Sequence, residues 1–210
     1  MTRSRKSLTW PCLVGAAIAS TAVTAMPVYA QDDPQARSSP AITQALRQQA
    51  PELWRSPELL TEIIRGFEIT PVPLALKGQN LALVGLGSYL VNAQGGCNDC
   101  HTNPSWAAGG NPFMGQPKRV NATGYLGGGT PFGPGIVSRN LTPENGLPGG
   151  RTYKQFVQIM RTGIDLDHAT PQYGPLLQVM PWPTYQNLTD TDLRAIYAYL
   201  KTIPAVRAKQ

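Results

Sequence analysis

The sequence feature that most restricts the fold is a segment rich in glycine and proline in the middle of the chain. Residues 103–150 hold 12 of the 21 glycines and seven of the 20 prolines, including three consecutive glycines at 127–129. This composition excludes a long regular helix there. A loop of this length inside a compact domain is uncommon unless it has a function. Wrapping a large planar ligand would be such a function, and short strands are expected within the loop.

The residues before this loop carry helical patterns. Pro57 suits the first position of a helix. The apolar residues that follow it at helical spacing are Leu59, Leu60, Ile63, Ile64 and Phe67. A further helix is predicted over residues 81–91. Its small residues Gly85, Gly87 and Ser88 cost helix stability, so we expect another helix to pack closely against them.

Two amphipathic helices are predicted after the loop. The first begins at a capping box of Thr152 and Gln155 and ends at Gly163. Thr189 and Asp192 form a similar cap for the second. Its apolar residues at helical spacing are Leu193, Ile196, Tyr197 and Leu200. With 210 residues, 41% of them hydrophobic, the chain is expected to fold as a mostly α-helical protein around one core.

The N-terminus has the pattern of an export signal. Three bases within the first six residues precede an uncharged stretch over 7–31, which includes small residues around Ala30. This pattern predicts a secretory signal over 1–30, cleaved after Ala30, and therefore a periplasmic protein. The alternative is an uncleaved membrane anchor, although the Ala, Ser and Thr content and Pro11 make the stretch weakly apolar.

The formal charge of +6 is partly a property of this signal. Loss of residues 1–30 would remove three bases and no acids. The remaining basic charge is weak evidence for a nucleic-acid partner, and none is expected. Association with a membrane is expected only through an uncleaved signal or through a partner complex.

A pentapeptide directly before the loop carries the chemistry. Cys12 lies in the predicted signal, so the exported chain keeps only Cys97 and Cys100, within a Cys-Asn-Asp-Cys-His sequence that ends at His101. Two thiols three positions apart on a helical turn suit the two vinyl groups of one haem, and the adjacent imidazole suits its iron as proximal ligand. We predict one covalent haem c at this motif.

Other interpretations of the motif are a redox disulfide, half of a zinc site, or chance. A zinc site needs about four ligands, and His168 is the one further cysteine or histidine of the exported chain. A thioredoxin-like site needs a βαβ setting, which the glycine-rich residues after His101 do not provide.

The sixth iron ligand has four candidates, which are Met114, Met160, Met180 and His168. Met160 lies on the apolar face of a predicted helix, where methionine is more often core filler. Met114 follows His101 by only 13 residues. Met180 is favoured, because it lies in a stiff loop before Pro181 and because methionine opposite histidine is the usual electron-transfer ligation. His168 is the main rival and would lower the potential, whereas an open iron site would indicate peroxide or gas chemistry.

Several segments resemble class I cytochrome c domains, especially the haem domains that accompany bacterial periplasmic alcohol, sugar and aldehyde dehydrogenases. The segments that carry the resemblance are 87–92, 97–101, 138–143, 180–185 and 188–200. The resemblance implies a class I cytochrome c fold over 81–204, in which the glycine- and proline-rich loop wraps the haem. Residues 31–80 would then be an extra N-terminal, partly helical segment, and 205–210 a C-terminal tail. Dehydrogenase subunits of this kind often carry three haem domains, whereas this chain has one attachment motif.

The resemblance also implies roles for particular residues. Met180 would be the distal iron ligand, and an N-terminal helix would cross a C-terminal helix beside the haem. The residues expected at that crossing are Gly85, Tyr89, Tyr197 and Leu200.

Three further residues are expected at the haem. Arg139 is expected to bond a haem propionate, because a guanidinium group pairs well with a carboxylate. Arg161 has the same chemistry, but its place suits an ordinary charge at a helix end. Trp182 and Tyr185 are expected to line the haem pocket.

The expected function is electron transfer rather than catalysis. No partner is evident in the sequence for Asp165 or Asp167, so no acid or base catalysis is assigned. The expected partners are redox proteins of a respiratory chain, namely a dehydrogenase, an oxidase or another cytochrome. One alternative is a haem enzyme, peroxidase-like or sulfur-oxidising, with a displaceable distal ligand. Another is a structural or assembly subunit of a redox complex that docks through residues 31–80.

Overall fold

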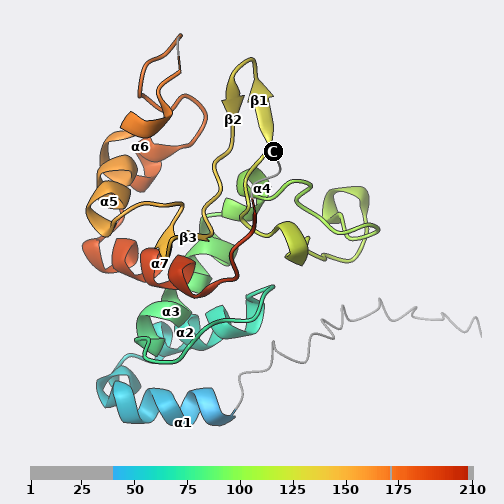
Figure 1. The fold of residues 1–210 in the computed structure, drawn as a ribbon. Coiled ribbons are helices and arrows are strands. Elements are labelled where there is room, and N and C mark those ends of the chain that lie inside the picture. Colours follow the sequence, from blue (N-terminus) through green and yellow to red (C-terminus); the bar gives the residue numbers. More distant parts are fainter. Residues whose placement is uncertain (1–39, 171, 208–210) are drawn as a thin grey trace, which may run out of the picture. The chain divides into compact units, whose positions relative to one another are not determined.

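Helix α3 (Leu81–Tyr89) lies between α2 (Pro57–Ile69) and α7 (Asp190–Thr202), and the rest of the fold is built around these three helices (Figure 1). The structure is a computed structural model that describes residues 40–170 and 172–207, apart from the side chain of His168. The predicted signal over 1–30 therefore lies outside the described residues.

Helices dominate the described residues, which confirms a mostly α-helical fold. The remaining α-helices are α1 (Pro40–Gln49), α4 (Cys97–His101), α5 (Tyr153–Thr162) and α6 (Trp182–Tyr185). Short 3-10 helices are η1 (Pro51–Arg55), η3 (Pro112–Met114), η4 (Ala122–Gly124) and η5 (Leu166–His168), and η2 (Leu90–Gln94) is a π-helical turn. Two antiparallel ribbons pair β1 (Pro131–Gly133) with β2 (Ile136–Val137), and β3 (Pro143–Glu144) with β4 (Leu147–Pro148).

The predicted helix ends after the loop are confirmed. Thr152 and Gln155 form a capping box at the start of α5, and Gly163 ends that helix with a φ of 70°. Thr189 and Asp192 form the equivalent box for α7. Each box satisfies backbone N–H groups that the first turn of a helix leaves unpaired, which is why these boundaries can be seen in the sequence.

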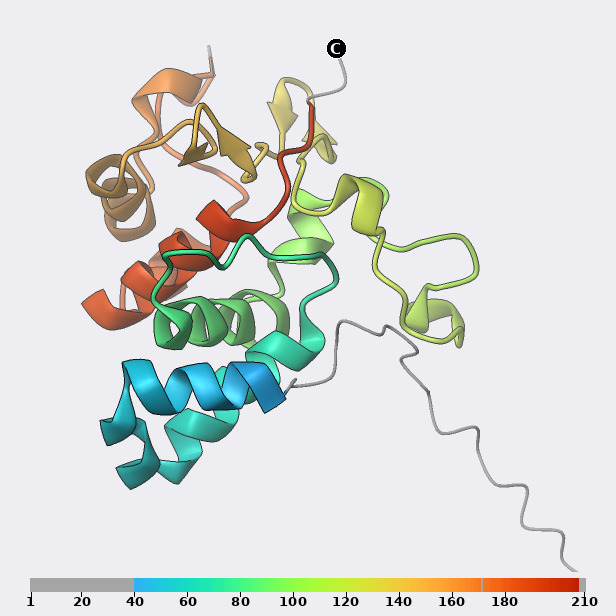
Figure 2. The same ribbon diagram turned by 60° about the horizontal axis from the view of Figure 1, so that its bottom comes forward.

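The small residues of α3 allow two helices to approach it. A side-chain carbon on Gly66 of α2 would collide with the backbone of Gly85, and one on Gly85 would meet the backbone and side chain of Ile63. On the opposite side, a side-chain carbon on Gly87 would collide with the carbonyl group of Ala195 in α7. Figure 2 shows α3, in green, between the teal α2 and the red α7. The expected close packing against the glycines of α3 is confirmed.

The crossing of α3 and α7 uses a different residue from the one expected. Gly87, and not Gly85, faces α7, where it lies against Ala195 and Tyr199. Gly85 faces α2 instead, because residues two apart on a helix point in directions about 200° apart. Tyr89 also lies on the α2 side, next to Gly66.

Residues before α3 belong to the same core as α3 and α7. Leu46 of α1 and Ile63 of α2 are buried in one hydrophobic cluster with Val84 and Leu200. The backbone also joins these parts, since the N–H of Leu81 donates to the side-chain oxygen of Gln49 at 3.1 Å. Burial of this kind stabilises the fold in proportion to the apolar area removed from water.

A buried group of hydroxyls and one amide joins four parts of the chain. The hydroxyl of Tyr199 lies 2.9 Å from the Thr70 hydroxyl and 3.0 Å from that of Tyr125, and it accepts a hydrogen bond from the Asn92 amide at 3.2 Å. Tyr125 in turn donates to the Asn92 carbonyl oxygen at 2.5 Å. Burial raises the pKa of Tyr199, and it raises that of Tyr125 well above the ordinary value.

The loop over 103–150 contains no long helix, and short strands form within it, as expected. It returns to α4 at Gly128, whose N–H donates to the carbonyl oxygen of His101 at 2.7 Å. The φ of Gly128 is +72°, and a side-chain carbon there would meet the backbone of Arg139. Glycine therefore lets two strands of the loop pass close together beside α4.

Among the described residues, no helix has the length and apolar character needed to cross a membrane.

Candidate functional site

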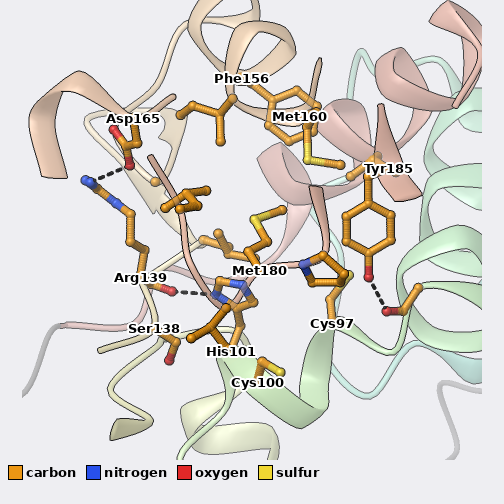
Figure 3. Close-up of a pocket in the computed structure, with 18 of the residues that line it drawn as sticks. Cys97, Cys100, His101, Ser138, Arg139, Phe156, Met160, Asp165, Met180 and Tyr185 are labelled. Atoms are coloured by element: carbon orange, nitrogen blue, oxygen red, sulfur yellow. Dashed lines mark hydrogen bonds and ion pairs between the residues drawn. The ribbon is translucent and has the colours of Figure 1, made fainter. Parts of the chain in front are cut away.

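The cysteine-histidine motif forms a short helix at one wall of a cavity. The π-helical turn η2 and Gly96, with a φ of 57°, lead into α4. Turns of the π type often occur at functional sites. Cys97, Cys100 and His101 all line the cavity, and both thiols are free (Figure 3).

The cavity is large and mainly apolar. Its volume is about 580 Å³, within the range of cofactor and small-molecule sites. Its apolar walls include Leu90, Val91, Ile136, Leu141, Phe156, Ile159, Leu177, Leu188, Ile196 and Leu200. Such walls exclude water from whatever lies against His101.

The imidazole of His101 is prepared to act as a ligand. Its Nδ1 atom lies 2.8 Å from the carbonyl oxygen of Arg139. A carbonyl oxygen only accepts, so Nδ1 carries the proton and Nε2 keeps its lone pair. Burial lowers the pKa of His101, and the hydrogen bond to Arg139 offsets only part of this effect. The neutral ring with a free Nε2 is the form that binds a metal.

The two thiols do not have the properties of a redox pair. Burial raises the pKa of Cys97 to about 12, and burial also raises that of Cys100. Reactive cysteines of redox motifs have a lowered pKa. Nor does the described part of the chain contain a group of three or more His, Cys, Asp or Glu side chains that could hold a metal ion, so a zinc site lacks ligands there.

Two of the four candidates for the distal ligand line the cavity. Met180 and Met160 are both among its lining residues, on the segments that lie opposite His101 in Figure 3. Met160 belongs to α5 and is only 5% exposed. Met114 does not line the cavity, because it is 71% exposed on η3. The side chain of His168 lies outside the described residues.

Tyr185 and Trp182 occupy different places. Tyr185 lines the cavity, and its hydroxyl donates to the carbonyl oxygen of Gly95 at 2.9 Å, which joins α6 to the turn before Cys97. Trp182 does not line the cavity. Its ring fits against Gly163, which has no side chain to obstruct it, and its Nε1 donates to the carbonyl oxygen of Leu177 at 3.2 Å. Trp182 therefore supports the loop that carries Met180.

The arginines also differ from one another in place. Arg139 lines the cavity, and its guanidinium group pairs with Asp165 at 2.8 Å. Arg161 is not among the lining residues, because it binds the carbonyl oxygens of Gln186 and Leu188 and pairs with Asp190 at 2.8 Å. It therefore holds the end of α5 against the start of α7.

The sequence gave no sign of one cluster at the cavity wall. Asp165 and Asp167, which show no partner in the sequence, both pair with arginine: Asp165 with Arg139 and Arg151, and Asp167 with Arg151. Arg151 lines the cavity, and its Nε atom is buried without a hydrogen-bond partner. A buried donor of this kind indicates an acceptor that is not part of the chain.

Comparison with known proteins gives relatives of one kind. The cytochrome c subunit of gluconate 2-dehydrogenase from Pantoea cypripedii is 36% identical over 122 residues, which are 57% of this chain and 23% of the relative. The cytochrome c subunit of quinone alcohol dehydrogenase from Gluconobacter oxydans is 34% identical over 127 residues, 59% of this chain and 24% of the relative. The cytochrome subunit of fructose dehydrogenase from Gluconobacter japonicus is 35% identical over 121 residues, 57% of this chain and 21% of the relative.

The chain is similar to cytochrome c subunits of bacterial dehydrogenases. It spans about a quarter or less of the length of these relatives. No family model matches it, and no solved structure matches it significantly.

These relatives imply haem c as the cofactor, and the residues at the cavity fit that group. The thiols and a free imidazole nitrogen face one apolar space, which suits the macrocycle and its iron. The unpaired Nε of Arg151 suits a carboxylate, which haem carries as propionate.

Proposed function

We propose that the protein is a periplasmic c-type cytochrome with one covalent haem, which carries single electrons between a dehydrogenase or other donor and a downstream acceptor. The observation that carries the proposal is the placement of Cys97, Cys100 and the free Nε2 of His101 on one wall of an apolar cavity. The similarity to dehydrogenase cytochrome subunits supports it.

The residues would hold the cofactor in separate ways. Cys97 and Cys100 would form the two thioether bonds, and His101 would bind the iron through Nε2. When bound, haem c supplies a one-electron couple. Met180 would provide the opposite ligand, because it lines the cavity from a loop that Pro181 and the Trp182 side chain hold in place.

Electron transfer requires that the surroundings of the metal change little between the two oxidation states. Packed apolar walls exclude water and limit rearrangement. The hydrogen bond from His101 to the backbone of Arg139 holds the imidazole in one orientation. These features suit a carrier rather than an enzyme, and the relatives are likewise named as cytochrome subunits.

An optical spectrum of the exported protein tests the proposal. A low-spin haem, with a near-infrared sulfur-to-iron band when oxidised and no reaction with carbon monoxide when reduced, would support an electron carrier with methionine bound. Prompt binding of carbon monoxide would contradict it and favour a haem enzyme with an open or displaceable distal site. Absence of haem from the exported protein would refute the proposal altogether.

Export itself has a separate test. Mass spectrometry of protein from the periplasmic fraction should give a chain that begins at Gln31. A chain that begins at residue 1 and sediments with membranes would mean that the N-terminal segment is an anchor.

A further inference from the structure

We infer that Arg151 and Arg139 form the site for one haem propionate, and that Asp165 is the residue that positions both guanidinium groups. The inference rests on the proposed function, and it concerns two residues, Arg151 and Asp165, that have no role in the proposal above. The ligand class is a carboxylate attached to the cofactor.

Asp165 is placed to orient two arginines at once. It is 2% exposed, and each of its carboxylate oxygens has its own partner. Oδ2 accepts from Arg139 at 2.8 Å, and Oδ1 accepts from Arg151 at 3.0 Å. The backbone N–H of Asp165 donates to the carbonyl oxygen of Pro175 at 2.8 Å, so the residue is also held by its main chain. Figure 3 shows the Asp165 and Arg139 pair at the edge of the cavity.

Arg151 keeps one donor free. Its two terminal nitrogens pair with Asp165 and with Asp167, at 3.0 and 3.1 Å. Its Nε is buried and has no partner. A buried N–H without an acceptor is costly, and Arg151 lines the same cavity as His101. An anionic oxygen in the cavity would satisfy this donor.

The charges of the cluster also leave room for one anion. Two guanidinium groups face one buried carboxylate, that of Asp165. The second acid, Asp167, is 60% exposed, so water screens its charge. A propionate carboxylate would balance the remaining positive charge, and guanidinium groups bind carboxylates with well-defined geometry.

The cluster is connected to the proposed iron ligand. Arg139 accepts the His101 Nδ1 proton on its backbone oxygen and is held by Asp165 through its side chain. Asp165 therefore acts on the cofactor through two routes, by charge and by positioning Arg139.

The first test is an infrared difference spectrum of the holoprotein between its two oxidation states, in the carboxylate region. Arg151→Lys keeps the positive charge and removes Nε, so the propionate band should shift. Arg161→Lys is the matched control, because Arg161 pairs with Asp190 outside the cavity, and its spectrum should equal that of the wild type. An unchanged propionate band in Arg151→Lys would overturn the assignment of Arg151.

The second test is the midpoint potential of two charge-changing variants. Arg151→Gln removes a positive charge and should lower the potential, because the oxidised haem becomes easier to form. Asp165→Asn removes a negative charge and should raise it. Asp190→Asn should leave it unchanged. A shift in the same direction for Arg151→Gln and Asp165→Asn would indicate only a loosened structure and would overturn the inference.

Haem content and the sulfur-to-iron band are measured for every variant. Wild-type protein with attached haem and bound methionine, together with failure of both tests above, would refute the inference and leave the proposed function intact. Wild-type protein without haem would refute both.

Discussion

The Nδ1 atom of His101 and the carbonyl oxygen of Arg139 lie 2.8 Å apart, so the ring is held by the main chain of a residue 38 positions later. Because the acceptor is a backbone atom, no change of side chain at position 139 removes it directly. The direction of Nε2 therefore depends on how the loop returns to α4, where Gly128 permits the close approach.

Replacement of Met180 tests the distal ligand. Met180→Ala should allow the reduced protein to bind carbon monoxide and should lower the midpoint potential, because methionine ligation raises the potential of haem iron. The control is Met160→Ala, which removes the other methionine of the cavity and should keep the near-infrared sulfur-to-iron band. If the band survives in Met180→Ala and is lost in Met160→Ala, the ligand is Met160.

Replacement of the cysteines tests covalent attachment. Cys97→Ala and Cys100→Ala should each leave one thioether bond, and the double variant should leave none. The measurement is the mass of the denatured polypeptide together with haem staining on a denaturing gel. Two thioether bonds in either single variant would rule out the assignment of these thiols.

Replacement of Gly87 tests the contact between α3 and α7. Gly87→Ala should lower the free energy of unfolding by about 3 kcal/mol, because the added methyl group meets backbone atoms of Ala195 that cannot move aside. Gly146→Ala is the control. Gly146 has a φ of +77° and open space around it, so backbone strain alone should cost about 1 kcal/mol. Urea unfolding followed by circular dichroism measures both, and equal losses would contradict the crowding at Gly87.

The buried tyrosines predict alkaline unfolding. Burial raises the pKa of Tyr125 and of Tyr199 in the folded protein, so the unfolded chain loses these protons first as pH rises. Stability from this source is complete below the ordinary tyrosine pKa of about 10 and falls above it. Phenolate absorbance from the two residues should therefore appear together with loss of helical circular dichroism. Tyr199→Phe should be less stable than the wild type by about 1–3 kcal/mol at neutral pH, because the partners of the hydroxyl are left unpaired. Ionisation of both tyrosines in a chain that stays folded would contradict this prediction.

Local features of the fold could be predicted from the sequence. The capping boxes at Thr152 and Thr189 depend on residues three positions apart, so neighbouring letters contain the whole pattern. The same holds for the attachment motif at Cys97, Cys100 and His101, where chemistry and spacing occur together in five residues.

Features that depend on distant residues could not be predicted in this way. Gly85 and Gly87 are equally small, and nothing nearby indicates which of them faces α7. Asp165 finds Arg139 and Arg151 at separations of 26 and 14 residues, which follow no periodic pattern. Trp182 turns toward Gly163 rather than toward the cavity for a similar reason, since the space that receives its ring is created by a glycine in another segment.

The close approach of Gly66 to Gly85 has a practical consequence for protein engineering. The side of α3 that carries Gly85 is covered by α2, and Leu46 of α1 is buried in the same cluster. A graft or fusion that began at Leu81 would expose a strip of helix shaped to receive another helix, with bare backbone at its centre. The smallest portable cassette that keeps this surface covered begins at Pro40, so the first two helices should travel with the motif whenever it is moved into another protein.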